Sequence, residues 1–162
     1  MVVHNILLIH LPAFRSLDFG LNYYWMGWPI TIYVPLTYLR LALTFMDDLI
    51  RIISTSQLSC ALHQLHITID DCNYDEYCTA TTSNQLIRMV NLHTFTFLKR
   101  FFSTLIIGWT LIEILTSSNI IPVLQHANIS IFINISDLNY ISSSPLFTDY
   151  RHVDVHLAFS LI

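Results

Sequence analysis

Charge, glycine and cysteine are all scarce in this chain of 162 residues, and each scarcity excludes a class of function. Asp, Glu, Lys and Arg together make up 11% of the residues, whereas an ordinary soluble domain has about 25%. The pair Lys99-Arg100 is too short to be a basic block, so the footprint of a nucleic-acid-binding protein is absent. The 3 glycines cannot supply a glycine-rich phosphate-binding loop.

The cysteines and the N-terminal residues give no sign of export. The chain has 3 cysteines, which cannot all pair and do not form a disulfide framework. The apolar run at residues 6–9 is short, and it lacks the preceding positive charge and the cleavage site of a signal peptide. We therefore expect a reducing compartment, the cytoplasm or the nucleus. Sequons begin at Asn128 and Asn134, and the sequence leaves their use open.

Hydrophobic residues, in contrast, make up 54% of the chain, with 10 Phe, 8 Tyr and 3 Trp. So many large apolar side chains exclude a disordered protein. The length corresponds to about one domain. The apolar excess indicates a piece of a larger assembly, a membrane protein, or a fold with much apolar surface to bury.

The pattern apolar-x-x-apolar-x-apolar occurs six times along the chain. The six copies are residues 14–19, 36–41, 62–67, 92–97, 124–129 and 150–155. Their central apolar residues are Leu17, Leu39, Leu65, Phe95, Ala127 and Val153. Each copy alternates as a short β-strand does, with apolar side chains on one side and polar side chains on the other.

Helical patterns lie between most of these copies. Segments expected to form helices are 44–53, with Met46, Leu49, Ile50 and Ile53 at helical spacing, 84–90, the stretch that starts at the capping box 110–113, and 136–141. Only residues 20–35 lack such a pattern, because Pro29 and Pro35 interrupt them. Strands alternating with helices at this spacing predict an α/β fold with a parallel sheet and helices on one side of it.

With these six copies the chain resembles the leucine-rich-repeat superfamily, in a degenerate version of its longer, ribonuclease-inhibitor-like form. The family motif continues to an Asn or Cys and a further apolar residue, which Asn22 and Tyr24 match in the first copy. The resemblance spans about residues 11–162. It implies an open, curved solenoid with a parallel sheet on the concave side and short helices on the convex side. Residues 1–162 would then form a single domain of about six irregular repeats.

The short helical stretches, such as residues 47–55, also resemble the repeat portions of F-box proteins. In that family an F-box docks onto a ubiquitin-ligase scaffold and the repeats select the substrate. This chain shows no F-box, and neither of its ends has the polar cap that stacked repeats need. We therefore interpret it as a fragment, or as a product truncated at both ends.

The leucine-rich-repeat resemblance implies a non-catalytic scaffold that binds another protein on its concave face. The outward strand positions form one row at Ser16, Tyr38, Gln64, Thr94, His126 and His152, and a second at Asp18, Arg40, His66, Thr96, Asn128 and Asp154. The expected partner-binding residues are Tyr38, Arg40, Gln64, His66, Thr68, Thr94, Thr96, His126, Asn128, His152, Asp154 and His156. The central apolar residues of the six copies are expected in the core.

Two groups of residues invite a metal or catalytic interpretation. The first is Cys60, His63, His66, Cys72 and Cys78. Residues three apart on a strand face opposite sides, so His63 and His66 should not share an ion.

The second group is His152, Asp154 and His156, which alternation places on one strand face. Such a row could bind a metal or orient a histidine for proton transfer, but no nucleophile lies beside it. We interpret it as a polar strand face, and we predict no enzyme, metal or cofactor.

A small multi-pass membrane protein is the alternative interpretation. Residues 24–46 contain one charged residue, Arg40, and residues 101–124 contain one, Glu113, and both runs are long enough to span a bilayer. Pro29 and Pro35 interrupt the first run, and several Ser and Thr residues occur in the second. The scaffold is therefore favoured, without a nucleic-acid or membrane partner and with an unknown oligomeric state.

Overall fold

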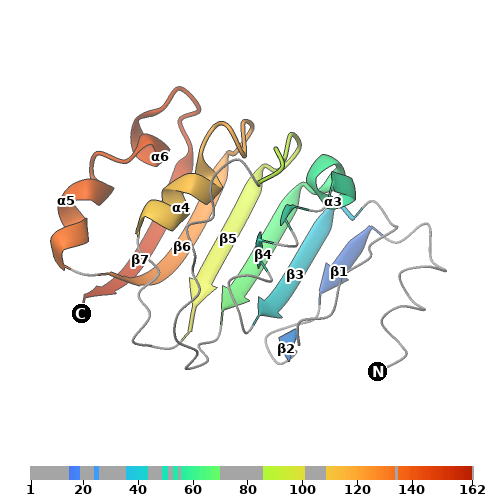
Figure 1. Ribbon diagram of the computed structural model, residues 1–162, viewed down its shortest axis with the longest axis horizontal. Helices are drawn as coiled ribbons and strands as arrows, with labels where there is room; N and C mark the ends of the chain where they lie inside the picture. Colours follow the sequence, from blue (N-terminus) through green and yellow to red (C-terminus); the bar gives the residue numbers. More distant parts are fainter. Residues whose placement is uncertain are drawn as a thin grey trace.

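The computed structural model describes residues 15–18, 24–25, 36–43, 49–50, 53–54, 56–69, 86–100, 109–133 and 135–161. These residues form an α/β fold built on one parallel sheet (Figure 1). Its five long strands are β3 (Tyr38–Leu43), β4 (Gln64–Ile69), β5 (Thr94–Lys99), β6 (His126–Ile133) and β7 (Asp154–Leu161). Two short strands, β1 (Ser16–Asp18) and β2 (Tyr24–Trp25), both pair with β3. The spatial order β1-β3-β4-β5-β6-β7 follows the chain.

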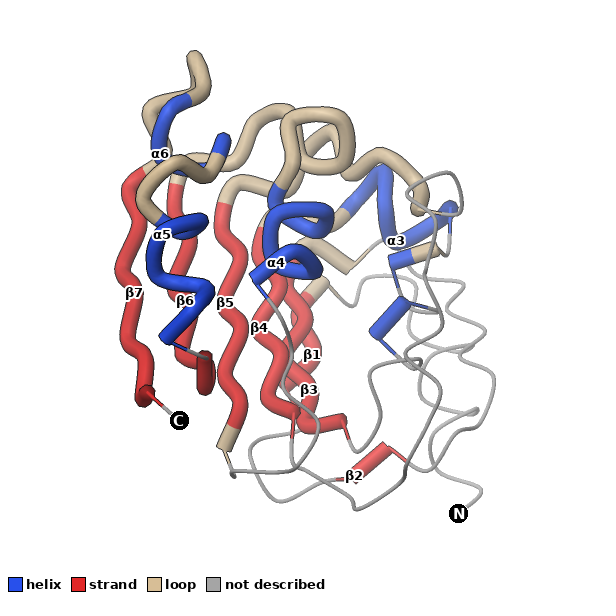
Figure 2. The backbone as a smooth tube through the Cα atoms, turned by 60° about the vertical axis from the view of Figure 1, so that its left-hand side comes forward, coloured by secondary structure: helices blue, strands red, loops and turns tan. Residues whose placement is uncertain are grey.

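The helices lie over one face of this sheet, as Figure 2 shows. Among the described residues the helices with defined bounds are α3 (Ser56–Ala61), α4 (Trp109–Thr116), α5 (Leu138–Ile141) and α6 (Pro145–Thr148), with the 3₁₀-helix η2 (Ile135–Asp137) before α5. Trp109 of α4 stacks on Phe147 of α6 with the ring centres 6.0 Å apart. The predicted parallel sheet with short helices on one side is therefore confirmed.

One continuous core fills the space between the sheet and the helices. In the second to fifth copies of the sequence pattern, all three apolar positions are no more than 3% exposed. These residues are Leu36, Leu39, Leu41, Leu62, Leu65, Ile67, Leu92, Phe95, Phe97, Leu124, Ala127 and Ile129. The strand register also aligns the predicted central residues, from Leu17 opposite Leu39 to Phe95 opposite Ala127. Periodic burial of apolar side chains thus fixes the strand faces, as the alternation predicted.

The same hydrogen-bond arrangement precedes each strand from β3 to β6. One backbone carbonyl accepts hydrogen bonds from two consecutive amides of the next copy. The four carbonyls belong to Arg15, Thr37, His63 and His93, with N–O distances from 2.8 to 3.1 Å. Because these four copies enter their strands through the same contact, the strands β3 to β6 begin level with one another although the intervening segments differ in length.

In the sixth copy the predicted strand register is wrong by two residues. Val155, not Val153, pairs with Ala127 in the sheet, and His156 pairs with Asn128. Tyr150, the expected first apolar position, is exposed. His152 precedes β7 with a φ of 50°, a left-handed conformation that is uncommon outside glycine. A shift by two residues preserves the period-2 alternation, so the pattern alone could not fix this register.

The expected helices are confirmed in part. Residues 49, 50 and 53 are helical, and η2 with α5 occupies the predicted 136–141. The described part of 84–90 is not helical, because Met89 donates its amide to the carbonyl of Ile120 at 2.7 Å instead. The predicted capping box is also wrong, since α4 already begins at Trp109, whose Nε1 donates to Glu113 Oε1 at 3.2 Å. The prediction omits α3 and α6, although Ser144 at the N-cap and Pro145 at the first position of α6 are a start signal for a helix. Residues 44–48, 51–52 and 84–85 of the predicted helices lie outside the described residues.

In their described parts, the two apolar runs of the membrane interpretation form short strands and a short helix. The first run includes the strands β2 and β3, and the second includes α4, which has 8 residues. Among the described residues, none of the helices has the length and apolar character needed to cross a membrane. Residues 26–35, 44–46 and 101–108 lie outside the described part of these runs.

Candidate interaction face

The side chains that alternate with the core positions of β3 to β7 form the face of the sheet opposite the helices, called the outer face below. The strand register arranges them in three rows, counted from the start of the strands. The first row is Tyr38, Gln64, Thr94, His126 and Asp154. The second row is Arg40, His66, Thr96, Asn128 and His156. The third row is Ala42, Thr68, Leu98, Ser130 and Ala158.

Ten of the twelve predicted partner-binding residues lie in the first and second rows. Thr68 lies in the third row but is only 5% exposed, so it cannot contribute to an open surface. His152 lies in the turn before β7 rather than on the outer face. Asp154 takes the place expected for His152, and His156 takes the place expected for Asp154. Alternation predicts the direction of a side chain, but it does not predict what covers it.

Charged and aromatic groups meet at the β3 side of the outer face. Arg40 Nη1 lies 3.5 Å from Asp18 Oδ2, and both side chains are partly exposed. The ring of Tyr38 is tilted against that of His66 at a centroid distance of 5.2 Å. Burial and the nearby positive charge of Arg40 lower the pKa of His66, and the carboxylate of Asp18 opposes them. His66 is therefore a neutral hydrogen-bonding group at pH 7.

The shifted pKa of His66 can be measured directly. We expect its pKa to lie below the ordinary 6.5, and NMR titration of the ring protons measures it. Because the pKa falls on folding, neutral His66 contributes stability above pH 6.5 that is lost as the pH falls through the folded-state pKa. Arg40→Met should raise the pKa of His66, and Asp18→Asn should lower it further. A higher pKa in Asp18→Asn would contradict the electrostatic arrangement.

Two histidines share one carboxylate at the β7 end of the outer face. Asp154 Oδ2 lies 3.3 Å from His126 Nδ1 and 3.6 Å from His156 Nε2, and all three side chains are exposed. The contact between His126 and Asp154 joins two strands, so only the corrected register reveals it. Within the described part of the chain, no three or more His, Cys, Asp or Glu residues are grouped to hold a metal ion.

The sequence-predicted ligand candidates are separated in the fold. His63 precedes β4, where its ring meets the ring of His93 edge-on at 5.3 Å. Cys60 is exposed on α3, and its carbonyl accepts a hydrogen bond from Asn91 Nδ2 at 2.7 Å. Cys72 and Cys78 lie outside the described residues.

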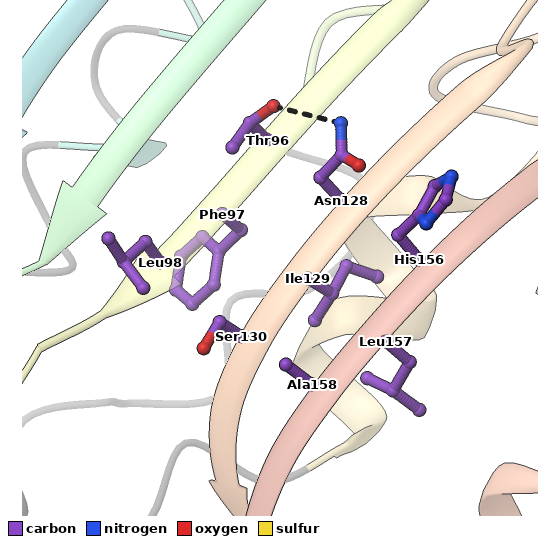
Figure 3. Close-up of a pocket in the computed structure, with 9 residues that line it drawn as sticks. All are labelled: Thr96, Phe97, Leu98, Asn128, Ile129, Ser130, His156, Leu157 and Ala158. Atoms are coloured by element: carbon purple, nitrogen blue, oxygen red, sulfur yellow. Dashed lines mark hydrogen bonds between the residues drawn. The ribbon is translucent and has the colours of Figure 1, made fainter.

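A groove of about 420 Å³ crosses the outer face over β5, β6 and β7 (Figure 3). Thr96, Asn128 and His156 of the second row line one side of it, and Asn128 Nδ2 donates to Thr96 Oγ1 at 3.4 Å. The third row supplies Leu98 and the small side chains of Ser130 and Ala158. The sequence prediction omits Leu98, Ser130 and Ala158 because they lie beyond the last residue of the repeated six-residue motif in their copies. The continued alternation of the strands was the signal that could have found them.

No protein-family model, curated protein or solved structure matches this chain. The function is therefore inferred from the outer face itself.

Proposed function

We propose that this chain is a non-catalytic scaffold that binds another protein on its outer face. In this proposal the sheet is the concave side of an open, curved, leucine-rich-repeat-like solenoid that works in the cytoplasm or the nucleus. The repeated core positions and the repeated carbonyl contact before each strand support the solenoid. The groove over β5 to β7 is the observation that carries the binding function.

The chemistry of the groove suits a protein partner. The side chains of Ser130 and Ala158 are short, so the groove has room for an apolar side chain of the partner. That side chain can contact Leu98 and the other apolar residues that line the groove. Asn128 and His156 then provide hydrogen-bonding groups at the rim. A buried apolar contact surrounded by polar groups is how most protein interfaces gain both affinity and specificity.

The remaining outer face extends the recognition surface toward β3. Arg40 and Tyr38 belong to the residue types that contribute most often to binding energy at interfaces. Because the first two rows carry hydrogen-bonding groups from β3 to β7, a partner can lie across all five long strands. Following the F-box resemblance, we also propose that this partner is a substrate protein presented to a ubiquitin ligase.

The groove can be tested by filling it. Peptides are selected from a random-peptide phage library on the immobilised full chain, and their Kd values are measured by titration. Ser130→Trp should weaken binding at least about tenfold, equivalent to roughly 1.4 kcal/mol, because the indole occupies the groove. Ser142→Trp, an exposed serine after α5, is the matched control and should leave the Kd unchanged. Selected peptides that bind Ser130→Trp as tightly as the unaltered chain would refute this site.

A further inference from the structure

Asp154 is the one carboxylate in the three rows of the outer face over β3 to β7. Its side chain is 60% exposed and contacts the rings of His126 and His156, and no described lysine or arginine contacts it. The one guanidinium group of the rows, Arg40, lies on β3 beside Asp18. The β7 end of the outer face therefore carries a negative charge when the two histidines are neutral.

This carboxylate also determines which nitrogen of each neutral histidine ring carries the proton. Oδ2 of Asp154 lies 3.3 Å from His126 Nδ1 and 3.6 Å from His156 Nε2. An ionised carboxylate only accepts hydrogen bonds, so the proton is favoured on the nitrogen that faces it. His126 Nε2 and His156 Nδ1 then keep their lone pairs. Because both side chains are more than half exposed, these two acceptors are open to a partner.

A further acceptor lies at the rim of the groove. Asn128 Nδ2 donates to Thr96 Oγ1 at 3.4 Å, which leaves the amide oxygen Oδ1 for a partner. Figure 3 shows this oxygen on the side of the amide away from Thr96, with His156 on the neighbouring strand. Hydrogen-bond acceptors thus line the surface from Asp154 to the groove, and one of them is charged.

We propose that the partner bound in the groove carries an arginine near its apolar side chain, and that the guanidinium group binds Asp154 between the two histidines. This inference rests on the proposed function. A guanidinium group is a planar fork of N–H donors without an acceptor, and it matches the geometry of a carboxylate. It can bind the carboxylate and also donate to a histidine lone pair, whereas the ammonium group of lysine is a compact point charge.

The strand spacing determines how far this arginine lies from the apolar residue. Asp154, His156 and Ala158 alternate along β7, so neighbouring rows are roughly 6.6 Å apart at about 3.3 Å per residue. Alternate residues of an extended peptide have the same spacing and point to the same side. If an apolar residue lies over Ala158, the residue two positions away lies over His156, and a long side chain there reaches toward Asp154. We therefore expect the arginine two positions from the apolar residue.

A double-mutant cycle between peptide and chain tests this pairing. Peptides are selected from a random-peptide phage library on the full chain, and those that Ser130→Trp no longer binds are kept. Their arginine is then replaced by citrulline, which has a similar shape without the charge. We expect the Kd to rise about fivefold on the unaltered chain, as for a partly exposed charge pair, and less than about 1.5-fold on Asp154→Asn. Asp18→Asn, at the exposed carboxylate beside Arg40, is the matched control and should keep the fivefold effect.

The outcomes distinguish this inference from the proposed function. Groove-binding peptides without an arginine, or an equal effect of citrulline on Asp154→Asn and the unaltered chain, would overturn the arginine site and leave the groove intact. Peptides that all bind Ser130→Trp as tightly as the unaltered chain would refute the groove itself, and this inference with it. Lysine in place of the arginine should raise the Kd about threefold, because it lacks the planar fork. An unchanged Kd with lysine would overturn the assignment to a guanidinium group.

Discussion

Replacing Phe97 with alanine is expected to lower the free energy of unfolding by about 3–5 kcal/mol. The side chain is fully buried on β5, in the middle of the sheet. Its row neighbours on β4 and β6 are Ile67 and Ile129, and the ring of Phe95 lies 6.3 Å away. Backbone pairing on both sides of β5 holds these neighbours in place. They cannot close around the missing ring, so a cavity adds to the lost burial.

Urea unfolding followed by circular dichroism measures this loss. Phe147→Ala removes the same side chain from an exposed position on α6, where the ring stacks on Trp109. There we expect about 1 kcal/mol, the size of a single aromatic contact. Equal losses in the two variants would show that the core does not lie between β5 and the helices.

The sequence predicts the middle of this fold well because one physical rule acts there repeatedly. Leucine at the first position and an apolar residue at the central and last positions must all reach the same core. In a parallel sheet, copies with the same offset between these residues come into register with one another. Leu39, Leu65 and Phe95 therefore align as their spacing predicts, although the segments between them are unequal.

Where the prediction fails, a tertiary contact outweighs the local pattern. Residues 152–157 alternate as well as residues 150–155, so alternation alone does not choose between the two registers of β7. The turn at Met89 is set by its hydrogen bond to Ile120, a residue distant in the sequence. Thr68 alternates outward yet is buried, as is its row neighbour Ala42. None of these three outcomes follows from periodicity.

The sequence likewise predicts only part of the candidate interaction face. The strand pattern is sufficient to place His66, Thr96 and Asn128 side by side in the second row. The contact between His126 and Asp154 and the groove at Ala158 require the true register of β7. Because both features lie at the end of the sheet where the prediction is displaced by two residues, the sequence alone could not identify the groove.

Replacing Arg151 with methionine is expected to destabilise the fold by about 3–5 kcal/mol, since it removes one partner of a buried ion pair. The Arg151 side chain is 3% exposed, and its Nε donates to Asp149 Oδ2 at 2.6 Å. Its Nη1 donates to the carbonyl of Ile121, also at 2.6 Å. Ile121 lies just before β6 and Arg151 just before β7, so one guanidinium group connects the approaches to both strands.

Urea unfolding of four chains resolves the energy of this pair: the unaltered chain, Arg151→Met, Asp149→Asn and the double variant. The methionine removes the guanidinium that donates to the Asp149 carboxylate and to the carbonyl of Ile121, and leaves the carboxylate with only the backbone amide of residue 151, which donates to its Oδ1 at 3.0 Å. The double variant also removes the carboxylate charge. The free energy of unfolding should therefore fall less in the double variant than the sum of its decreases in the two single variants. Arg88→Met, at an exposed arginine, is the control and should change stability by less than about 0.5 kcal/mol. Additive losses at positions 149 and 151 would mean that the two side chains do not interact. The pair lies in the turn that carries His152 into β7, so additive losses would also mean that it does not hold this turn in place.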